Sequence, residues 1–392
     1  MFPANQKKRR FVVQGFFLVT IAMQSVLWAD LAPGWGESII APSGLVPSLA
    51  FSSSTGYPSV SYSSGYAQFN GSSWTLNAPP CGFDRSSVAF NPCTGRAGLA
   101  MSAGLHTGCY SEFDGVNWLP AESFCGSSEC GQYPSLAFDP VTCLATVSRF
   151  NSFPPGGDLR FSVRSSANMW TTTVADNDVQ RTGAFTSLAY DPSTNRPCIA
   201  YQDVTNLDLR FACFDGSTWV KETVDSTGEV ASENLLLAFR ATPPHNAGIS
   251  YRDVTNGDLK YAEKSGLAWT ITTIDSVGDT GFTTSLAFHP TTGRPTIAYH
   301  DATNGALRLA EYNGSSWILS TVDDDAQPYA SLAFQPVTNQ PAIAYTRGSG
   351  QLVYVLRVST VPALSATGLV ISVGAILATG SMLFRRKTAT SS

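Results

Sequence analysis

The sequence predicts an all-β protein, a seven-bladed β-propeller built from four-stranded blades. Three observations lead there: a four-residue phrase of the SLAF type recurs seven times, each copy starts the same succession of strand-like runs, and a tryptophan opens the last run. The copies start at residues 48, 87, 135, 187, 236, 285 and 331, so successive copies begin 39 to 52 residues apart. A period of this length with strand-like units is typical of propellers.

One complete unit reads SLAYDPSTNRPCIAYQDVTNLDLRFACFDGSTW, from Ser187 to Trp219. Its runs are rich in Val, Ile, Thr, Tyr and Phe, and Gly, Pro, Asn and Asp separate them, as in short strands joined by turns. The prolines at Pro192, Pro290 and Pro336 fall in these turns, where the missing N–H costs no ladder bond. Each unit therefore predicts four antiparallel strands.

The tryptophans predict how the ring closes. Six follow the repeated phrases, at residues 74, 118, 170, 219, 269 and 317, and the seventh unit ends without one. The run GWGESIIAPSG, which contains Trp35, precedes the first phrase and matches the missing outer strand. We therefore expect Trp35 to complete the last blade, which makes the SLAF strand innermost. Small Ser and Ala side chains would then face the channel, and the tryptophans would pack between blades.

Both ends of the chain predict export. Lys7 to Arg10 precede an uncharged run, so residues 1–29 read as a signal peptide cleaved after Ala29, with an uncleaved anchor helix as the alternative. A second uncharged run, from residue 358 to 384, is long enough to span a bilayer and ends in Arg385, Arg386 and Lys387. Basic residues there place that end in the cytoplasm. The predicted organisation is a propeller over residues 30–360, outside the membrane, and a transmembrane tail over 361–392.

The tail begins VPALSATGL, in which Pro362, Leu364, Ser365 and Gly368 precede the apolar run and its arginines. This arrangement resembles bacterial C-terminal sorting signals of the PEP-CTERM and IPTL-CTERM type. The resemblance implies recognition by a sorting protease of the exosortase type and transfer to the cell surface or envelope. A plain membrane anchor is the alternative.

Composition excludes some partners and indicates an oxidising compartment. The net charge of −5 and the pI near 5.4 argue against nucleic-acid binding, which needs basic surfaces. Eight cysteines suit an exported chain with disulfides. Cys198 and Cys213 lie symmetrically about a turn on adjacent strands, so we expect them to pair. Cys125 and Cys130 are candidates for a small closed loop, and the other four cysteines stay unassigned.

One face of the ring should collect the turns that follow the second and fourth strands, including YQD, YRD and YHD at residues 201–203, 251–253 and 299–301. Within D-x-T-N, we expect the aspartate to accept bonds from backbone N–H groups as an Asx turn. The middle residue varies between blades and is the better recognition candidate, although solvated surface is the commoner fate of such side chains. The candidate ligand-binding residues are Gln202, Asp203, Arg252, Asp253, His300 and Asp301.

The phrases IAYQD, LRFA, ISYRD and LKYA resemble the HISYYD and LKYA repeats of exported bacterial propeller proteins, a likeness that is specific for fold and weak for function. There is no GxSxG, HExxH or P-loop motif, and no cofactor or metal is expected. The sequence favours a monomeric binding or adhesion module for a glycan or surface protein, acting through the loop-rich face. A polysaccharide hydrolase or lyase and a purely structural surface protein are the alternatives, so enzymatic activity stays open.

Overall fold

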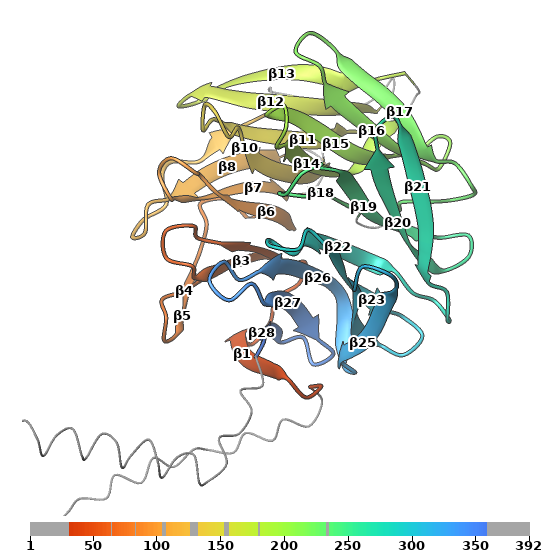
Figure 1. Ribbon diagram of the computed structural model, residues 1–392. Coiled ribbons are helices and arrows are strands. Elements are labelled where there is room, and N and C mark those ends of the chain that lie inside the picture. Colours follow the sequence, from red (N-terminus) through yellow and green to blue (C-terminus); the bar gives the residue numbers. More distant parts are fainter. Residues whose placement is uncertain are drawn as a thin grey trace, which may run out of the picture.

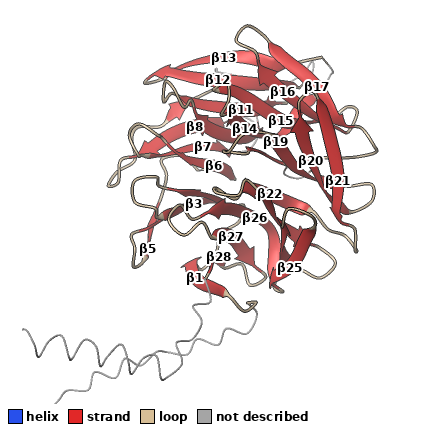
Figure 2. Ribbon diagram, viewed as in Figure 1, coloured by secondary structure: helices blue, strands red, loops and turns tan. Residues whose placement is uncertain are grey.

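A computed structural model describes residues 31–358 except 64, 83, 104–106, 126–131, 153–156, 179–180 and 233–234. The predicted signal peptide at 1–29 and the predicted tail at 361–392 lie outside the described residues. Within those residues every named element is a β-strand (Figure 2), and none is a helix that could cross a bilayer.

The strands form seven four-stranded sheets, named blades 1 to 7 in chain order and arranged about one axis (Figure 1). Blades 1 and 2 contain β2 (Ser48–Phe51), β3 (Pro58–Tyr62), β4 (Gly65–Phe69) and β5 (Trp74–Asn77), then β6 (Arg85–Phe90), β7 (Ala97–Ala103), β8 (Thr107–Phe113) and β9 (Glu122–Ser123). Blades 3 and 4 contain β10 (Gln132–Phe138), β11 (Ala145–Asn151), β12 (Asp158–Ser166) and β13 (Met169–Asp176), then β14 (Thr182–Asp191), β15 (Arg196–Asp203), β16 (Asp208–Phe214) and β17 (Trp219–Asp225). Blades 5 and 6 contain β18 (Leu236–Phe239), β19 (Ala247–Asp253), β20 (Asp258–Ser265) and β21 (Ala268–Asp275), then β22 (Phe282–Phe288), β23 (Pro295–Asp301), β24 (Ala306–Tyr312) and β25 (Trp317–Asp323).

Blade 7 joins the two ends of the described chain. Its order from the inside is β26 (Ala326–Phe334), β27 (Pro341–Arg347), β28 (Leu352–Arg357) and then β1 (Trp35–Ala41). Strand β1 pairs antiparallel with β28, with Trp35 opposite Arg357, and the two lie side by side in Figure 1. The predicted closure is confirmed, and the pairing covers what would otherwise be two open sheet edges.

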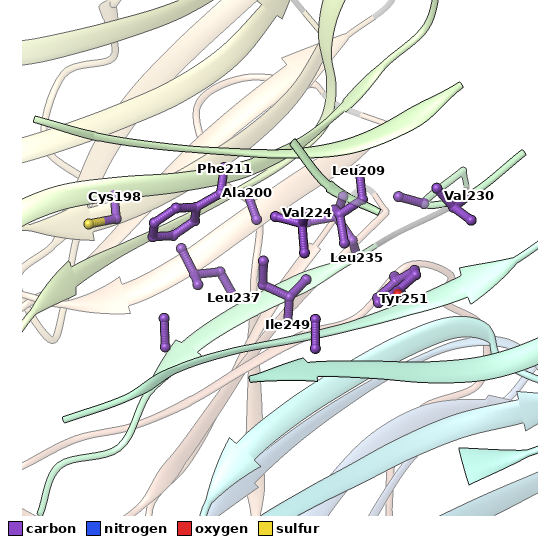
Figure 3. Close-up of a cluster of buried hydrophobic side chains, with 13 residues drawn as sticks. Cys198, Ala200, Leu209, Phe211, Val224, Val230, Leu235, Leu237, Ile249 and Tyr251 are labelled. Carbon is purple, nitrogen blue, oxygen red and sulfur yellow. The ribbon is translucent and has the colours of Figure 1, made fainter. Parts of the chain in front are cut away.

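The hydrophobic core is divided among the junctions between neighbouring blades. Seven clusters of buried side chains occur, one for each junction. Figure 3 shows the cluster between blades 4 and 5, where Leu209 and Phe211 of β16 meet Leu237 and Ile249 of the next blade. A four-stranded sheet has two apolar faces, and each blade buries both against its neighbours.

The predicted packing of the tryptophans is confirmed. Each of the six tryptophans that follow a repeated phrase contacts, edge to face, an aromatic ring on the third strand of the preceding blade, with ring centroids 5.2–5.5 Å apart. The pairs are Trp74–Tyr354, Trp118–Tyr66, Trp170–Tyr110, Trp219–Phe161, Trp269–Phe211 and Trp317–Tyr261. The first of these pairs crosses the closing junction.

The serine of the repeated phrase has a role beyond its small size. Its Oγ accepts a hydrogen bond from a backbone N–H on the innermost strand of the next blade, at 2.9–3.2 Å. The bonds run from Leu49 to Ser331, Val88 to Ser48, Leu136 to Ser87, Leu188 to Ser135, Leu237 to Ser187 and Leu332 to Ser285. Blade 5 carries Leu236 at this position, so the corresponding hydroxyl is missing at the junction of blades 5 and 6. The serines thus satisfy N–H groups on an edge that has no further strand to pair with.

The predicted Cys198–Cys213 disulfide is confirmed and links opposite residues of β15 and β16. Two bridges left unassigned from the sequence are Cys81–Cys109 and Cys93–Cys143, and the second ties blade 2 to blade 3. Cys125 is also disulfide-bonded, and its expected partner, Cys130, lies outside the described residues.

Replacing Ser285 with alanine should lower the free energy of unfolding by about 1–3 kcal/mol, because the buried Leu332 N–H loses its acceptor. Urea unfolding of the variant measures this loss. The control is Ser226→Ala in an exposed turn, which should stay within about 0.5 kcal/mol of the parent. Equal effects of the two substitutions would contradict a structural role for the serine ring.

Candidate functional site

The face predicted to carry recognition residues does collect the turns after the second strands, the exits of the fourth strands and the starts of the innermost strands. Asp203 behaves as predicted for an Asx turn. Its Oδ1 accepts N–H bonds from Thr205 at 2.9 Å and Asn206 at 3.1 Å, and its Oδ2 accepts one from the Asn206 amide. Asp253 and Asp301 repeat the pattern with the asparagines three residues on. The structural role expected for these aspartates is confirmed.

The variable residues beside these aspartates are not solvated, which corrects the expectation from the sequence. Gln202 is 3% exposed and His300 is 5% exposed. The Gln202 amide donates to the Val230 carbonyl at 3.1 Å, and His300 Nε2 donates to the Ala326 carbonyl at 2.9 Å. Both side chains therefore point into the junction with the next blade, where Val230 and Ala326 lie.

Arg252 lies nearest to the surface of the three variable residues. Its guanidinium contacts Asp279 at 2.5 Å and stacks over the Phe282 ring at 4.9 Å. Asp279 is half exposed, so this ion pair marks the rim of the loop-rich face. Burial lowers the pKa of His300 below its ordinary value, although the bond to Ala326 and nearby carboxylates oppose that shift. The role of Gln202, Arg252 and His300 in ligand binding stays a prediction.

A buried clamp recurs at four junctions on this face and joins blades 3 to 7. The Tyr251 hydroxyl donates to Asp225 at 2.7 Å, and Lys260 contacts Asp225 at 3.4 Å and Asp253 at 2.7 Å. The same tyrosine, aspartate and cation recur as Tyr201–Asp176–Arg210, Tyr299–Asp275–Arg308 and Tyr345–Asp323–Arg347. Each aspartate belongs to the blade before its tyrosine. The aspartates at the exits of the fourth strands therefore hold the ring together.

The clamp makes stability depend on pH in acid. Burial by itself would raise the pKa of Asp225, but bonds from Thr227 and Tyr251 and the Lys260 charge hold it below its ordinary value of 3.8. The unfolded chain therefore binds a proton at a higher pH than the folded chain does. Asp225 contributes fully to stability at pH values above its ordinary pKa. This contribution is lost as the pH falls through the lowered pKa of the folded state.

Asp225→Asn should cost about 3 kcal/mol at pH 7, because it removes one partner of a buried ion pair. It should also flatten the loss of stability between neutral pH and pH 3. Urea unfolding across that range measures both effects, with the exposed Asp324→Asn as the control. Identical slopes in the parent and Asp225→Asn would show that the clamp does not carry the pH dependence.

The mouth of the central channel is a feature that sequence reasoning missed. The residue two positions before the serine has positive φ at Val46, Tyr133, Phe185, Thr283 and Tyr329, a rare conformation for bulky side chains. Tyr133 packs on Phe185 at 4.3 Å, and the Arg85 guanidinium lies over the rings of Tyr133 and Tyr329. The cavity here measures about 150 Å³, below the range of about 300–1,000 Å³ typical of ligand pockets.

A larger cavity, of about 520 Å³, lies between blades 5 and 6, and we call it the 5/6 cleft. Its described lining residues are Asn246, Tyr261, Glu263, Ser265, Thr270, Thr272, Pro295, Tyr312, Ser315, Ser316 and Trp317. Trp317 lies between two tyrosines, with ring centroids 5.4 Å from Tyr261 and 5.5 Å from Tyr312. The cleft therefore combines aromatic faces with several hydroxyl and amide groups.

Glu263 is the only charged residue among the described residues that line the 5/6 cleft. Its Oε1 accepts bonds from Arg240 at 3.0 Å and Asn246 at 2.9 Å. The Tyr261 hydroxyl is buried beside the Glu263 carboxylate, to which it can donate a hydrogen bond. Burial and then the Glu263 charge raise the pKa of Tyr261 well above its ordinary value, so the hydroxyl stays a neutral donor.

The sequence indicated the rings of this cleft as packing residues only. Trp317 and Tyr261 match the residue types of the repeat, and Glu263 lies in no recognisable motif. The available signal was Tyr312, which occupies a position where blades 3, 5 and 7 carry a cation and blades 1, 2 and 4 carry a phenylalanine. That substitution has meaning only once the neighbouring blade is known.

Comparison with known proteins shows the fold. A mutant of the Aleuria aurantia lectin in complex with Fucα1-6GlcNAc matches 72% of this chain and 98% of its own, with 14% identity and a TM-score of 0.50. AofleA from Arthrobotrys oligospora matches 74% and 90%, with 11% identity and a TM-score of 0.51. SapL1 lectin in complex with α-methyl fucoside matches 73% and 99%, with 14% identity and a TM-score of 0.50. No protein-family model matches the chain, and no curated protein matches it in sequence.

Proposed function

We propose that this protein is an exported, non-enzymatic propeller that binds carbohydrate in the 5/6 cleft. The observation that carries the proposal is the combination of Trp317, Tyr261 and Tyr312 with the polar side chains of Glu263 and Asn246 around one cavity of about 520 Å³. A sugar ring presents apolar C–H faces and a rim of hydroxyls. Aromatic faces with a few placed polar groups match both kinds of surface.

Two further observations support the proposal. Two proteins of similar fold, one from Aleuria aurantia and the other SapL1, are described as lectins, and both are seen with fucosides. Within the described residues, the cleft is lined by one carboxylate, Glu263. Glycoside hydrolysis ordinarily requires a pair of carboxyl groups across the scissile bond, so the cleft favours binding over turnover.

The cellular setting belongs to the same proposal. Three disulfides support an oxidising compartment outside the cytoplasm. The signal peptide over residues 1–29 and the sorting signal over 361–392 would deliver the propeller to the surface or envelope. A sorting protease of the exosortase type would act on the tail there. A monomer with one glycan cleft would then serve as a binding or adhesion module.

Trp317→Ala should abolish binding on a glycan array, because it removes the central ring of the cleft. Trp219→Ala is a matched control: Trp219 packs on Phe161 and Phe214 at 5.2 and 5.6 Å, as Trp317 packs on its two tyrosines. The control should keep the binding pattern of the parent while losing similar stability. Binding that survives Trp317→Ala would contradict the cleft as the site.

Arg252→Ala in the same assay tests the loop-rich face as the site instead. Binding lost in Arg252→Ala and kept in Trp317→Ala would move the site to that face. Release of reducing sugar from any polysaccharide would replace the binding proposal with an enzymatic one.

A further inference from the structure

Three junctions of this ring contain a cation that crosses from one blade to a carboxylate of the preceding blade. The cation lies at the end of the third strand, opposite the tryptophan of the outer strand. Arg357 of blade 7 makes two bonds to Glu311 of blade 6, at 2.7 and 2.8 Å, and lies 5.0 Å from the centre of the Trp35 ring. The protein therefore repeatedly builds a site for a cation beside a carboxylate and a tryptophan.

The other two junctions with this cation show the same chemistry. Arg164 of blade 3 contacts Glu122 of blade 2 at 2.6 Å and Glu112 at 3.7 Å. Lys264 of blade 5 contacts Glu222 of blade 4 at 2.5 Å and lies 5.2 Å from the centre of the Trp269 ring. Ion pairs and the faces of aromatic rings both stabilise a desolvated cation.

The 5/6 cleft has the carboxylate and the tryptophan but lacks the cation from the next blade. Strand register places Glu263 of blade 5 where blade 6 carries Glu311, since each lies opposite the residue that follows the tryptophan. The same register places Tyr312 of blade 6 where blade 7 carries Arg357. Among the described junctions, only this one has a glutamate at that position without a cation from the next blade beside it. It also contains the 520 Å³ cavity.

We infer that the 5/6 cleft binds a sugar that carries a free ammonium group, a hexosamine without its N-acetyl group. The ammonium takes the place that the guanidinium of Arg357 occupies at the next junction, beside Glu263 and over Trp317. The sugar ring lies against Trp317 and Tyr312. This inference rests on the proposed carbohydrate-binding function and names its ligand class.

The charges around Glu263 leave room for such a ligand. Arg240 and Asn246 both bond to Oε1, whereas both oxygens of Glu311 are taken by Arg357 at the next junction. Arg240 does not line the cavity, and the side chain of Lys264 is directed to Glu222 at the opposite junction. Arg294 lies against the Gly314 turn at the rim. Glu263 therefore has one ion pair, with Arg240 of its own blade at 3.0 Å, and among the described residues no cation from blade 6 pairs with it.

A saccharide fits this cleft better than a lysine side chain from a protein partner. A lysine side chain is a narrow apolar stem, whereas the cleft is broad and rimmed by hydroxyls. Four of those hydroxyls come from Thr270, Thr272, Ser315 and Ser316. These groups match several sugar hydroxyls around one ring.

The test compares glucosamine, N-acetylglucosamine, glucose and Nα-acetyl-lysine methylamide by isothermal titration calorimetry on the full-length protein. Glucosamine should bind at least about tenfold more tightly than either neutral sugar, as expected for a charge-assisted bond. Glu263→Gln should remove that preference. The matched control, Glu311→Gln, should lower the melting temperature through loss of the Arg357 pair and leave the preference intact.

The outcomes separate this inference from the proposed function. Equal binding of glucosamine and the neutral sugars would overturn the inference and leave carbohydrate binding in place. Tighter binding of the lysine amide would overturn it in favour of a protein partner. No binding of any sugar, here or on the array, would overturn the proposed function as well.

Discussion

Every blade of this ring depends on its two neighbours to cover the faces of its sheet and the inner edge of its first strand. A four-stranded sheet cannot bury both faces by itself, and its innermost strand has N–H groups without a partner strand. The inter-blade tryptophans cover the faces, and the serine hydroxyls bond the edge. Strand β1 extends this dependence around the whole ring, because without it blade 7 would have no outer strand.

This constraint explains which residues repeat. The serine, the tryptophan, the clamp tyrosine and its aspartate all make contacts between one blade and the next. A binding site can then form at a junction that lacks some of these repeated contacts. The junction of blades 5 and 6 has Leu236 in place of the serine, and it keeps Glu263 although Tyr312 stands where three other blades carry a cation. It keeps the clamp of Tyr299, Asp275 and Arg308, so the blades stay joined while the outer part of the junction opens into a cleft.

Much of the fold was predictable from the sequence because the residues that repeat are the ones that make these contacts. Blade number, closure through Trp35, the Cys198–Cys213 bridge and the Asx turns all follow from positions within one unit or from counting units. The burial of Gln202 and His300 was not predictable in the same way. Variation within a repeat identifies the positions that differ between blades. The direction in which each of these side chains points depends on the twist of the strand and on the next blade. The cleft depends on Glu263 and Tyr312, 49 residues apart, and their relation appears only when two blades are placed together.

The most direct measurement of the central claim, that a missing cross-blade cation makes the 5/6 cleft a binding site, is the glucosamine affinity of Tyr312→Arg. The substitution restores the residue type that blade 7 has at Arg357, next to Glu263 and Trp317. The new guanidinium should pair with Glu263, so the melting temperature should be held or raised while glucosamine affinity falls at least about tenfold. A folded Tyr312→Arg protein that binds glucosamine as tightly as the parent would contradict the account.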